Sequence, residues 1–276
     1  MSLTTAVATT IRGVRVVLLA ALMCAMLAGC SGDSESSAVA TSPTTAPAAT
    51  TESPATSQPP PTTTASSTAD LRVYFLQDGK LAATSRRVAR TVAVGRAALG
   101  ALAGGPSDAE QQLGFTTACV DSQLDRASLA IADGEATIEP PLDGACRDQA
   151  AWTLLQFPTV ERVNGATRED LEGAAPGILV DSPAPFERVS SPLRVTGTAN
   201  TYEATFEYDL LDSDGRSLAH HFVTATSGNG TRGTFDVSIP FDVSRAVDGE
   251  IVVYESSAED GSRIKIRRIP LRLEPS

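Results

Sequence analysis

The stretch Ala204-Thr205-Phe206-Glu207-Tyr208-Asp209-Leu210-Leu211, followed by Asp212-Ser213-Asp214-Gly215, sets the pattern for the C-terminal part of the chain. Its first half is typical of a β-strand, and its second half is typical of a turn. The combination recurs, and we expect strands at 178–180, 193–197, 204–211, 220–226, 233–239, 250–255 and 264–273. Seven short strands separated this regularly predict an immunoglobulin-like β-sandwich over residues 178–276.

Residues 70–165 show a different pattern, in which expected strands and helices alternate. Ser107 and Glu110 have the spacing of a capping box, which indicates the start of a short helix. A mixed order of this kind predicts a small α+β domain, so the fold class of the whole chain is α+β followed by an all-β sandwich. Residues 166–177 are expected to be a loop-like linker. The other expected elements are strands at 71–76, 81–88, 127–132, 135–139 and 160–163, and helices at 92–102 and 147–156.

The first 29 residues predict a signal peptide. Arg12 and Arg15 precede an apolar run, residues 16–27, that is shorter than the roughly 20 residues needed to span a bilayer. The run ends in Leu27-Ala28-Gly29-Cys30, which closely resembles the bacterial lipobox. That resemblance implies cleavage before Cys30 and acylation of its thiol. The alternative is an uncleaved anchor helix with an incidental cysteine, which the polar segment directly after Cys30 disfavours.

Residues 30–69 are expected to tether the folded part to the outer face of the cell membrane. After Cys30 the segment is dominated by Ser, Thr, Ala and Pro and has no aromatic residue. Such a composition buries too little apolar surface to offset its ordering entropy, so we expect disorder. As a random coil the tether spans about 35 Å, and as polyproline II it approaches ~120 Å.

Two cysteines remain after the signal peptide is removed and Cys30 is acylated, namely Cys119 and Cys146. In an exported, oxidising setting a disulfide between them is the favoured interpretation, and two buried free thiols are the alternative. Two cysteines without a nearby histidine do not make a four-ligand zinc site, so we expect no metal.

The charge balance argues against nucleic-acid binding. Removing Arg12 and Arg15 lowers the 22 basic residues to 20, against 33 acidic residues, which leaves a net charge of −13. A strongly acidic chain repels phosphate backbones. Scarce lysine, with abundant Ala, Arg, Asp and Thr, suggests a high-GC actinobacterium as the source.

Residues 70–165 resemble the GerMN domain of spore-germination and sporulation lipoproteins. Four pieces carry the resemblance: 73–76, which includes Tyr74; 98–106, which ends in Gly105-Pro106; Gly114-Phe115-Thr116-Thr117-Ala118; and 153–163. The family pattern usually continues with proline where this chain has Cys119, which suggests a lineage-specific disulfide.

The second domain resembles the immunoglobulin-like domain of bacterial spore germination. Its matching pieces are 180–183, 195–199, 202–204 with Glu203, and 230–235 with Gly233. The resemblance implies a non-catalytic role in the cell envelope, without a cofactor, in which the protein binds or scaffolds envelope proteins or cell-wall polymer.

The competing hypothesis is an envelope hydrolase that acts on peptidoglycan or polysaccharide. Glu135 and Glu139 share a face of one expected strand and are the carboxylate pair such an enzyme would use. His220 and His221 are the only histidines, and alternation along a strand directs their side chains to opposite faces. No partners for a histidine-based site are evident, so a structural or surface role is favoured for both.

Overall fold

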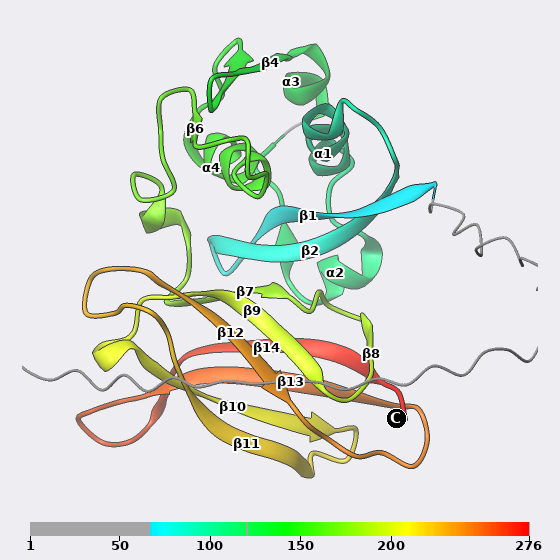
Figure 1. Cartoon of the computed structure of the whole chain (residues 1–276), viewed down its shortest axis with the longest axis vertical. Helices are drawn as coiled ribbons and strands as arrows, with labels where there is room; N and C mark the ends of the chain where they lie inside the picture. The colour runs from blue at the N-terminus through cyan, green and yellow to red at the C-terminus, as the bar shows by residue number, and fades with distance from the viewer. Residues whose placement is uncertain (1–66, 120, 276) are drawn as a thin grey trace, which may run out of the picture. The chain divides into compact units, whose positions relative to one another are not determined.

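The computed structural model describes residues 67–119 and 121–275, and residues 62–276 form one compact unit. The signal peptide, Cys30 and nearly all of the expected tether lie outside the described residues. Strands outnumber helices among the described elements (Figure 1). None of the described helices combines the length and the apolar character needed to cross a membrane.

The first domain combines two small sheets with four helices. One sheet has the order β2-β1-β3 and the other has the order β4-β5-β6. Helices α1 and α4 both pack on β1 and on each other. The strands are β1 (Thr68–Gln77), β2 (Lys80–Ala89), β3 (Phe115–Thr116), β4 (Ser128–Ala132), β5 (Glu135–Glu139) and β6 (Arg162–Val163), and the helices are α1 (Val94–Ala103), α2 (Asp108–Gln112), α3 (Asp121–Arg126) and α4 (Gly144–Leu154).

Most of the expected elements of this domain are present, including the capping box at Ser107 and Glu110. Helix α4 begins three residues earlier than predicted, at Gly144. Strand β6 is shorter than predicted, because the backbone first turns at Val160, whose N–H donates to the carbonyl of Phe157. The sequence did not predict β3 or α3, which are too short to carry a clear apolar period.

The second domain is a two-sheet sandwich, and all seven expected strands are present. One sheet has the order β11-β10-β13-β14-β8 and the other has the order β12-β9-β7. The unpredicted strand β8 has only two residues. The strands are β7 (Ile178–Ser182), β8 (Arg188–Val189), β9 (Leu193–Ala199), β10 (Thr205–Asp212), β11 (Ser217–Thr224), β12 (Gly233–Ile239), β13 (Val247–Ser256) and β14 (Arg263–Leu273).

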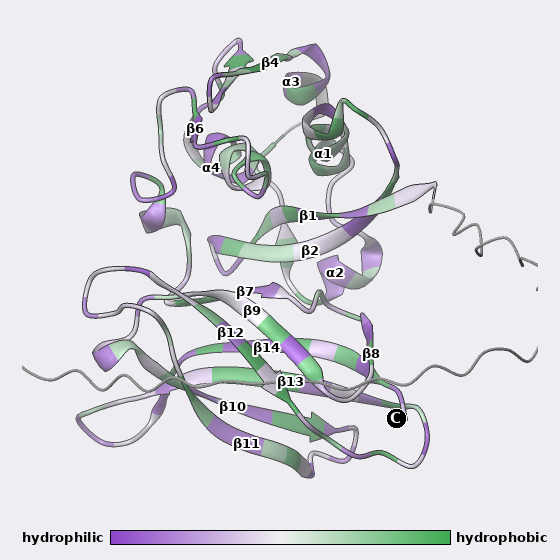
Figure 2. Cartoon of the chain, in the orientation of Figure 1, coloured by the Kyte–Doolittle hydropathy of each residue, from purple (hydrophilic) through white to green (hydrophobic). Residues whose placement is uncertain are grey.

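Alternation along β9 separates the core of the sandwich from its outer surface. Leu193 and Val195 are buried in the sandwich core, whereas Arg194 between them is exposed. Figure 2 shows hydrophobic and hydrophilic bands alternating along this strand. The partner strand β12 follows the same rule, with Phe235 and Ile239 buried in that core. Alternate residues of β9 and β12 therefore leave one polar sheet face directed away from the sandwich core.

The two domains have separate hydrophobic cores that meet at β7. Ile178 and Val180 belong to the core of the sandwich, whereas Leu179 between them belongs to the core of the first domain. Leu171 and Ala175, from the expected linker, are also buried in the first core. Strand β7 therefore contributes one face to each domain.

Candidate functional site

The joint between the domains is held by a buried phenol. The Oη of Tyr74, on β1, donates a hydrogen bond of 2.7 Å to Oδ1 of Asp181, on β7. The Tyr74 ring lies edge-on to the indole of Trp152, with 5.7 Å between the ring centroids. Burial raises the pKa of Tyr74, and the carboxylate of Asp181 raises it further, so the phenol remains a hydrogen-bond donor at physiological pH.

The segment 166–177 is fixed to the first domain through Trp152. The indole Nε1 donates to the carbonyl of Leu171 over 3.4 Å. The guanidinium of Arg168 lies over the indole ring, 4.5 Å from its centroid, and donates to the carbonyl of Leu155 over 2.8 Å. These contacts hold Arg168 in place while its side chain remains partly exposed.

The same segment is fixed to the second domain through Arg232. Its guanidinium donates to the carbonyl of Pro176 over 2.6 Å and to the carbonyl of Thr198 over 3.3 Å. Glu172 accepts a hydrogen bond of 2.6 Å from the side-chain amide of Asn200. Because side chains of both domains form hydrogen bonds with the segment 166–177, the joint resembles a fixed interface more than a flexible hinge.

A groove of about 970 Å³ lies between this joint and the outer face of the β12-β9-β7 sheet. Its sheet side consists of Arg194, Thr196 and Thr198 on β9 and of Thr234 and Asp236 on β12, which are paired across the strands. Its other side carries Arg72 from β1, Arg168 from the linker and Asp181 from β7. The lining side chains are almost all hydroxyls or ions: Arg72, Arg168, Asp181, Ser182, Arg194, Thr196, Thr198, Thr224, Thr226, Thr234 and Asp236.

The charges in this groove are not balanced. Arg194 and Asp236 pair with each other, through contacts of 2.9 and 2.6 Å. By contrast, the guanidinium of Arg72 has neither a hydrogen bond nor an ion pair with any described residue, and that of Arg168 has no carboxylate partner among them. Burial raises the pKa of Asp181, although nearby arginines, Arg72 among them, oppose that rise.

A second hollow of about 520 Å³ continues the groove and shares Arg168, Thr198 and Thr234 with it. Glu161, Glu169 and Glu172 supply three carboxylates to its lining, so this end is more acidic. Ionic and hydroxyl side chains therefore line both hollows, and carboxylates outnumber arginines only in the second.

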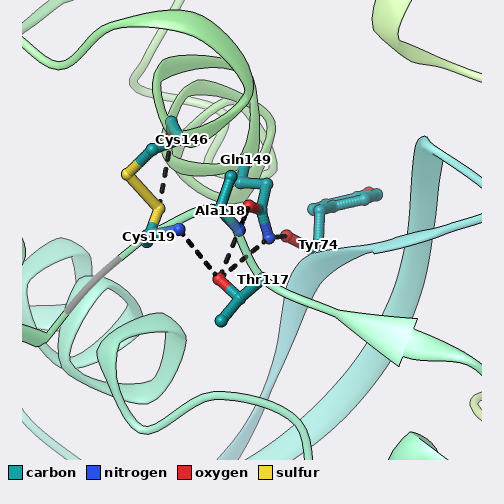
Figure 3. Close-up of a disulfide and its surroundings, with 6 residues drawn as sticks. All are labelled: Tyr74, Thr117, Ala118, Cys119, Cys146 and Gln149. Atoms are coloured by element: carbon teal, nitrogen blue, oxygen red, sulfur yellow. Dashed lines mark hydrogen bonds between the residues drawn. A yellow bond between two sulfur atoms is a disulfide. The ribbon is translucent and has the colours of Figure 1, made fainter.

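The disulfide predicted from the sequence is confirmed, since Cys119 is bonded to Cys146. Figure 3 shows it beside the amide of Gln149, which accepts from the backbone N–H of Ala118 over 2.8 Å and donates to the carbonyl of Tyr74 over 3.1 Å. Gln149 also contacts the hydroxyl of Thr117. The Gln149 side chain links α4, β1 and the segment after β3. The disulfide joins the same helix to the same segment, which indicates a structural role for it.

The other residues of the family motifs also have structural positions. Gly105 and Gly114 adopt left-handed backbone conformations at the ends of α1 and α2, with φ of +70° and +84°. The carbonyl of Pro106 accepts from the side chain of Gln111, and Thr116 pairs with Leu76 in the sheet.

Glu203 and Gly233 stabilise the loops at one end of the sandwich. Glu203 has a φ of 52°, and its N–H donates to the side chain of Asn229 over 3.0 Å. A Cβ at Gly233 would lie 2.2 Å from the backbone nitrogen of Ser227. Three residues of the motif pieces, Tyr74, Asp181 and Arg232, take part in the joint beside the groove.

Glu135, one of the two carboxylates suggested for a hydrolase, is engaged in structural contacts. Its Oε2 is 3.0 Å from the Nε of Arg162, and its Oε1 accepts from the N–H of Gly165 over 2.7 Å. Glu139 lies four residues further along β5, which places the two Cα atoms about 13 Å apart at 3.3 Å per residue.

His220 has partners that the sequence did not reveal. Its Nε2 lies 3.1 Å from Glu207 and 3.2 Å from the hydroxyl of Tyr254, on the outer face of the five-stranded sheet. Arg263 covers the ring of Tyr254 at 3.9 Å and pairs with Asp209 at 2.7 Å. Cross-strand register brings this cluster together, since Asp209 lies opposite His220 and Glu207 lies opposite Tyr254.

The basic residues at the C-terminus are paired rather than free. Arg263, Arg268 and Arg272 contact Asp209, Glu250 and Asp248, respectively. Lys265 contacts Glu255 at 2.6 Å, and Arg267 reaches Asp78 of the first domain at 3.4 Å. The pair of Arg267 and Asp78 therefore connects the two domains. Among the described residues, no group of three or more His, Cys, Asp or Glu side chains is arranged to hold a metal ion.

Comparison with known families identifies the second domain. Residues 177–262 match the family model of the immunoglobulin-like domain of bacterial spore germination. The second domain is similar to that family over this range, which is less than half of the chain. This match confirms the assignment predicted from the motifs of that domain. A comparison with curated proteins finds no match.

Comparison with solved structures finds the tandem GerMN domains of the sporulation protein GerM from Bacillus subtilis. The identity is 15%, the TM-score is 0.30, and the match covers 63% of this chain and 62% of the GerM chain. This chain therefore spans less than two thirds of that structure. A second match, WR4, a member of the MSP family from C. elegans, has 14% identity and a TM-score of 0.21, and covers 37% of this chain and 99% of WR4. Scores this low carry no structural argument, so the resemblance of the first domain to GerMN rests on its motifs.

Proposed function

We propose that the protein is a non-catalytic lipoprotein of the cell envelope whose GerMN-like and immunoglobulin-like domains together bind an envelope component in the groove beside their joint. The groove is the observation that supports this role, because both domains contribute side chains to it and their contacts fix its geometry. A preformed polar groove on rigid elements needs little reorganisation before a ligand binds.

The anchoring part of the proposal rests on Cys30 and the segment that follows it. Two or three acyl chains on one residue give stable membrane attachment, whereas one chain binds reversibly. A tether of residues 30–69 would then hold the binding groove away from the membrane surface. In cells labelled with palmitate, Cys30→Ser should abolish incorporation, and continued labelling of that variant would rule out the lipid anchor.

The binding part of the proposal can be tested with a photo-crosslinking amino acid in the full-length protein in its native membrane. A probe at Thr196, on the groove floor, should give a discrete crosslinked product. The same probe at Glu259, in an exposed turn that does not line the groove, should give only background. Equal, diffuse labelling from both positions would contradict a binding groove.

The hydrolase hypothesis predicts a different result. A purified protein that cleaves isolated cell wall, and loses that activity on Glu135→Gln, would replace the binding role with catalysis. The structural role of Glu135 in holding Arg162 and Gly165 gives this alternative no support.

A further inference from the structure

The groove has a chemical character that narrows its ligand. Its lining offers hydroxyls from Ser182 and five threonines, and its only lining aromatic, Phe235, is 5% exposed. Such a lining offers no large, exposed apolar side chain to anchor a hydrophobic peptide. It suits a ligand whose own surface consists of hydroxyl and amide groups, which can exchange hydrogen bonds with water for hydrogen bonds with threonines.

The basic end of the groove adds a requirement for negative charge. Arg72 and Arg168 both line it, and neither forms an ion pair with a carboxylate of the described residues, although the carboxyl of Asp181 lies near both. This sets them apart from Arg86, Arg194 and Arg232, each of which pairs with a carboxylate. A guanidinium without a partner in a groove is a ready donor to a carboxylate or a phosphate, which it can bind in a bidentate manner.

We infer that the groove binds an extended polyhydroxylated chain that carries anionic groups, with an anionic group held by Arg72 and Arg168 and the neutral part of the chain lying along the threonines of β9 and β12. This inference rests on the proposed binding role of the groove and specifies its ligand. Carboxylate-bearing glycan strands and polyol-phosphate polymers share this chemistry.

The test measures binding of the purified full-length protein in detergent to three probes by calorimetry. Peptidoglycan glycan strands freed of their peptides carry a lactyl carboxylate on alternate sugars. Chitohexaose has a similar amino-sugar backbone without that carboxylate, and polyglycerol phosphate supplies phosphate in place of carboxylate. We expect at least one anionic probe to bind tenfold or more tightly than chitohexaose, with an affinity that falls as salt rises. The probe that does so distinguishes the two sources of the anion.

Two variants separate the contributions of charge and hydroxyls. Arg72→Gln should weaken binding of the anionic probe about tenfold and leave chitohexaose unchanged, because one charge-assisted contact is lost. Thr196→Val should weaken both probes by a similar factor. Arg188→Gln, at an exposed ion pair outside the groove, is the control and should change neither. The Arg72 side chain has no described polar partner, so its variant should fold, which a thermal melt checks.

Two results would overturn the inference. One is equal affinity for the neutral and anionic probes, or an anionic preference that survives Arg72→Gln. The other is the absence of binding to all three probes. If the crosslinker at Thr196 still captured a discrete protein in that case, the binding role would stand and the ligand class would be wrong. If the crosslinker captured nothing, the binding role of the groove and the inferred ligand class would both be contradicted.

Discussion

Tyr74 and Asp181, 107 positions apart in the sequence, share a hydrogen bond of 2.7 Å that joins the two domains. Tyr74→Phe removes the donor and leaves the partly buried carboxyl of Asp181 without it. We expect a loss of about 1–3 kcal/mol in the free energy of unfolding, measured by denaturant titration. Tyr202→Phe, at a tyrosine that is 59% exposed, is the matched control and should be neutral. Equal effects of the two substitutions would show that the contact contributes nothing.

Asp181 also predicts a pH dependence. Burial raises its pKa in the folded protein above the value in the unfolded chain, so folding favours its protonated form. The stability that this group contributes is therefore greatest at low pH and is lost as pH rises from the unfolded pKa through the folded pKa. Asp181→Asn keeps an acceptor for Tyr74 but cannot ionise. The melting temperature of the variant, relative to that of the wild type, should therefore rise as pH increases from about 4 to 7. A constant difference would contradict this assignment.

Glu110 should have the opposite pH dependence. Its burial alone would raise its pKa, but hydrogen bonds from Arg86, Thr84 and Ser107 lower it to about 2. The stability from this carboxylate is present above the unfolded pKa, near 4.5, and is lost as pH falls toward 2. Glu110→Gln leaves Arg86 without its ion pair and should cost about 3–5 kcal/mol at pH 7, measured by denaturant unfolding. Asp70→Asn, at the exposed pair with Arg87, is the control and should have little effect, because solvent screens that pair.

The disulfide should make a measurable contribution to stability. Cys119 and Cys146 are 27 positions apart, and closing a loop of that length is worth about 3.5 kcal/mol in the chain-entropy treatment. Replacing both by serine should lower the melting temperature by roughly 10 °C. Reducing agent should lower the wild-type melting temperature and leave the double variant unchanged. A wild-type protein that is insensitive to reductant and reacts with maleimide when unfolded would show two free thiols instead.

Gly197, on β9, is packed too closely against β7 and β12 to leave room for a side chain. A Cβ there would be 2.1 Å from the carbonyl oxygen of Leu179 and 2.7 Å from the ring of Phe235. Gly197→Ala should therefore displace β7 or the core and destabilise the protein by about 1–3 kcal/mol. Gly173→Ala, at a position with no atom within 4 Å of the added carbon, should be neutral or slightly stabilising. A thermal melt of both variants checks this, and a neutral Gly197→Ala would contradict the close packing.

The strands of the sandwich could be predicted because each combines a strand pattern with a turn of Asp, Ser, Gly or Asn. Helix α4 was harder to delimit, because every residue from Gln149 to Leu154 is buried and the helix has little apolar periodicity. The groove could not be predicted at all. It depends on Arg72, Arg168 and Thr196, which come from three separate segments, and tertiary contacts of the joint bring them together, the packing of Leu171 and Leu179 among them.

The most direct test of the account compares the accessibility of the groove in cells and in isolation. Thr196→Cys and Glu259→Cys variants would be treated with a membrane-impermeant maleimide, first in intact cells and then as detergent-purified protein. If the groove is displayed outside the membrane and occupied there, both variants will label in intact cells. The Thr196 position will then react at least fivefold more slowly in cells than after purification, while the Glu259 position reacts at the same rate in both. Equal rates at Thr196 in the two settings, or no labelling of either variant in intact cells, would contradict the account.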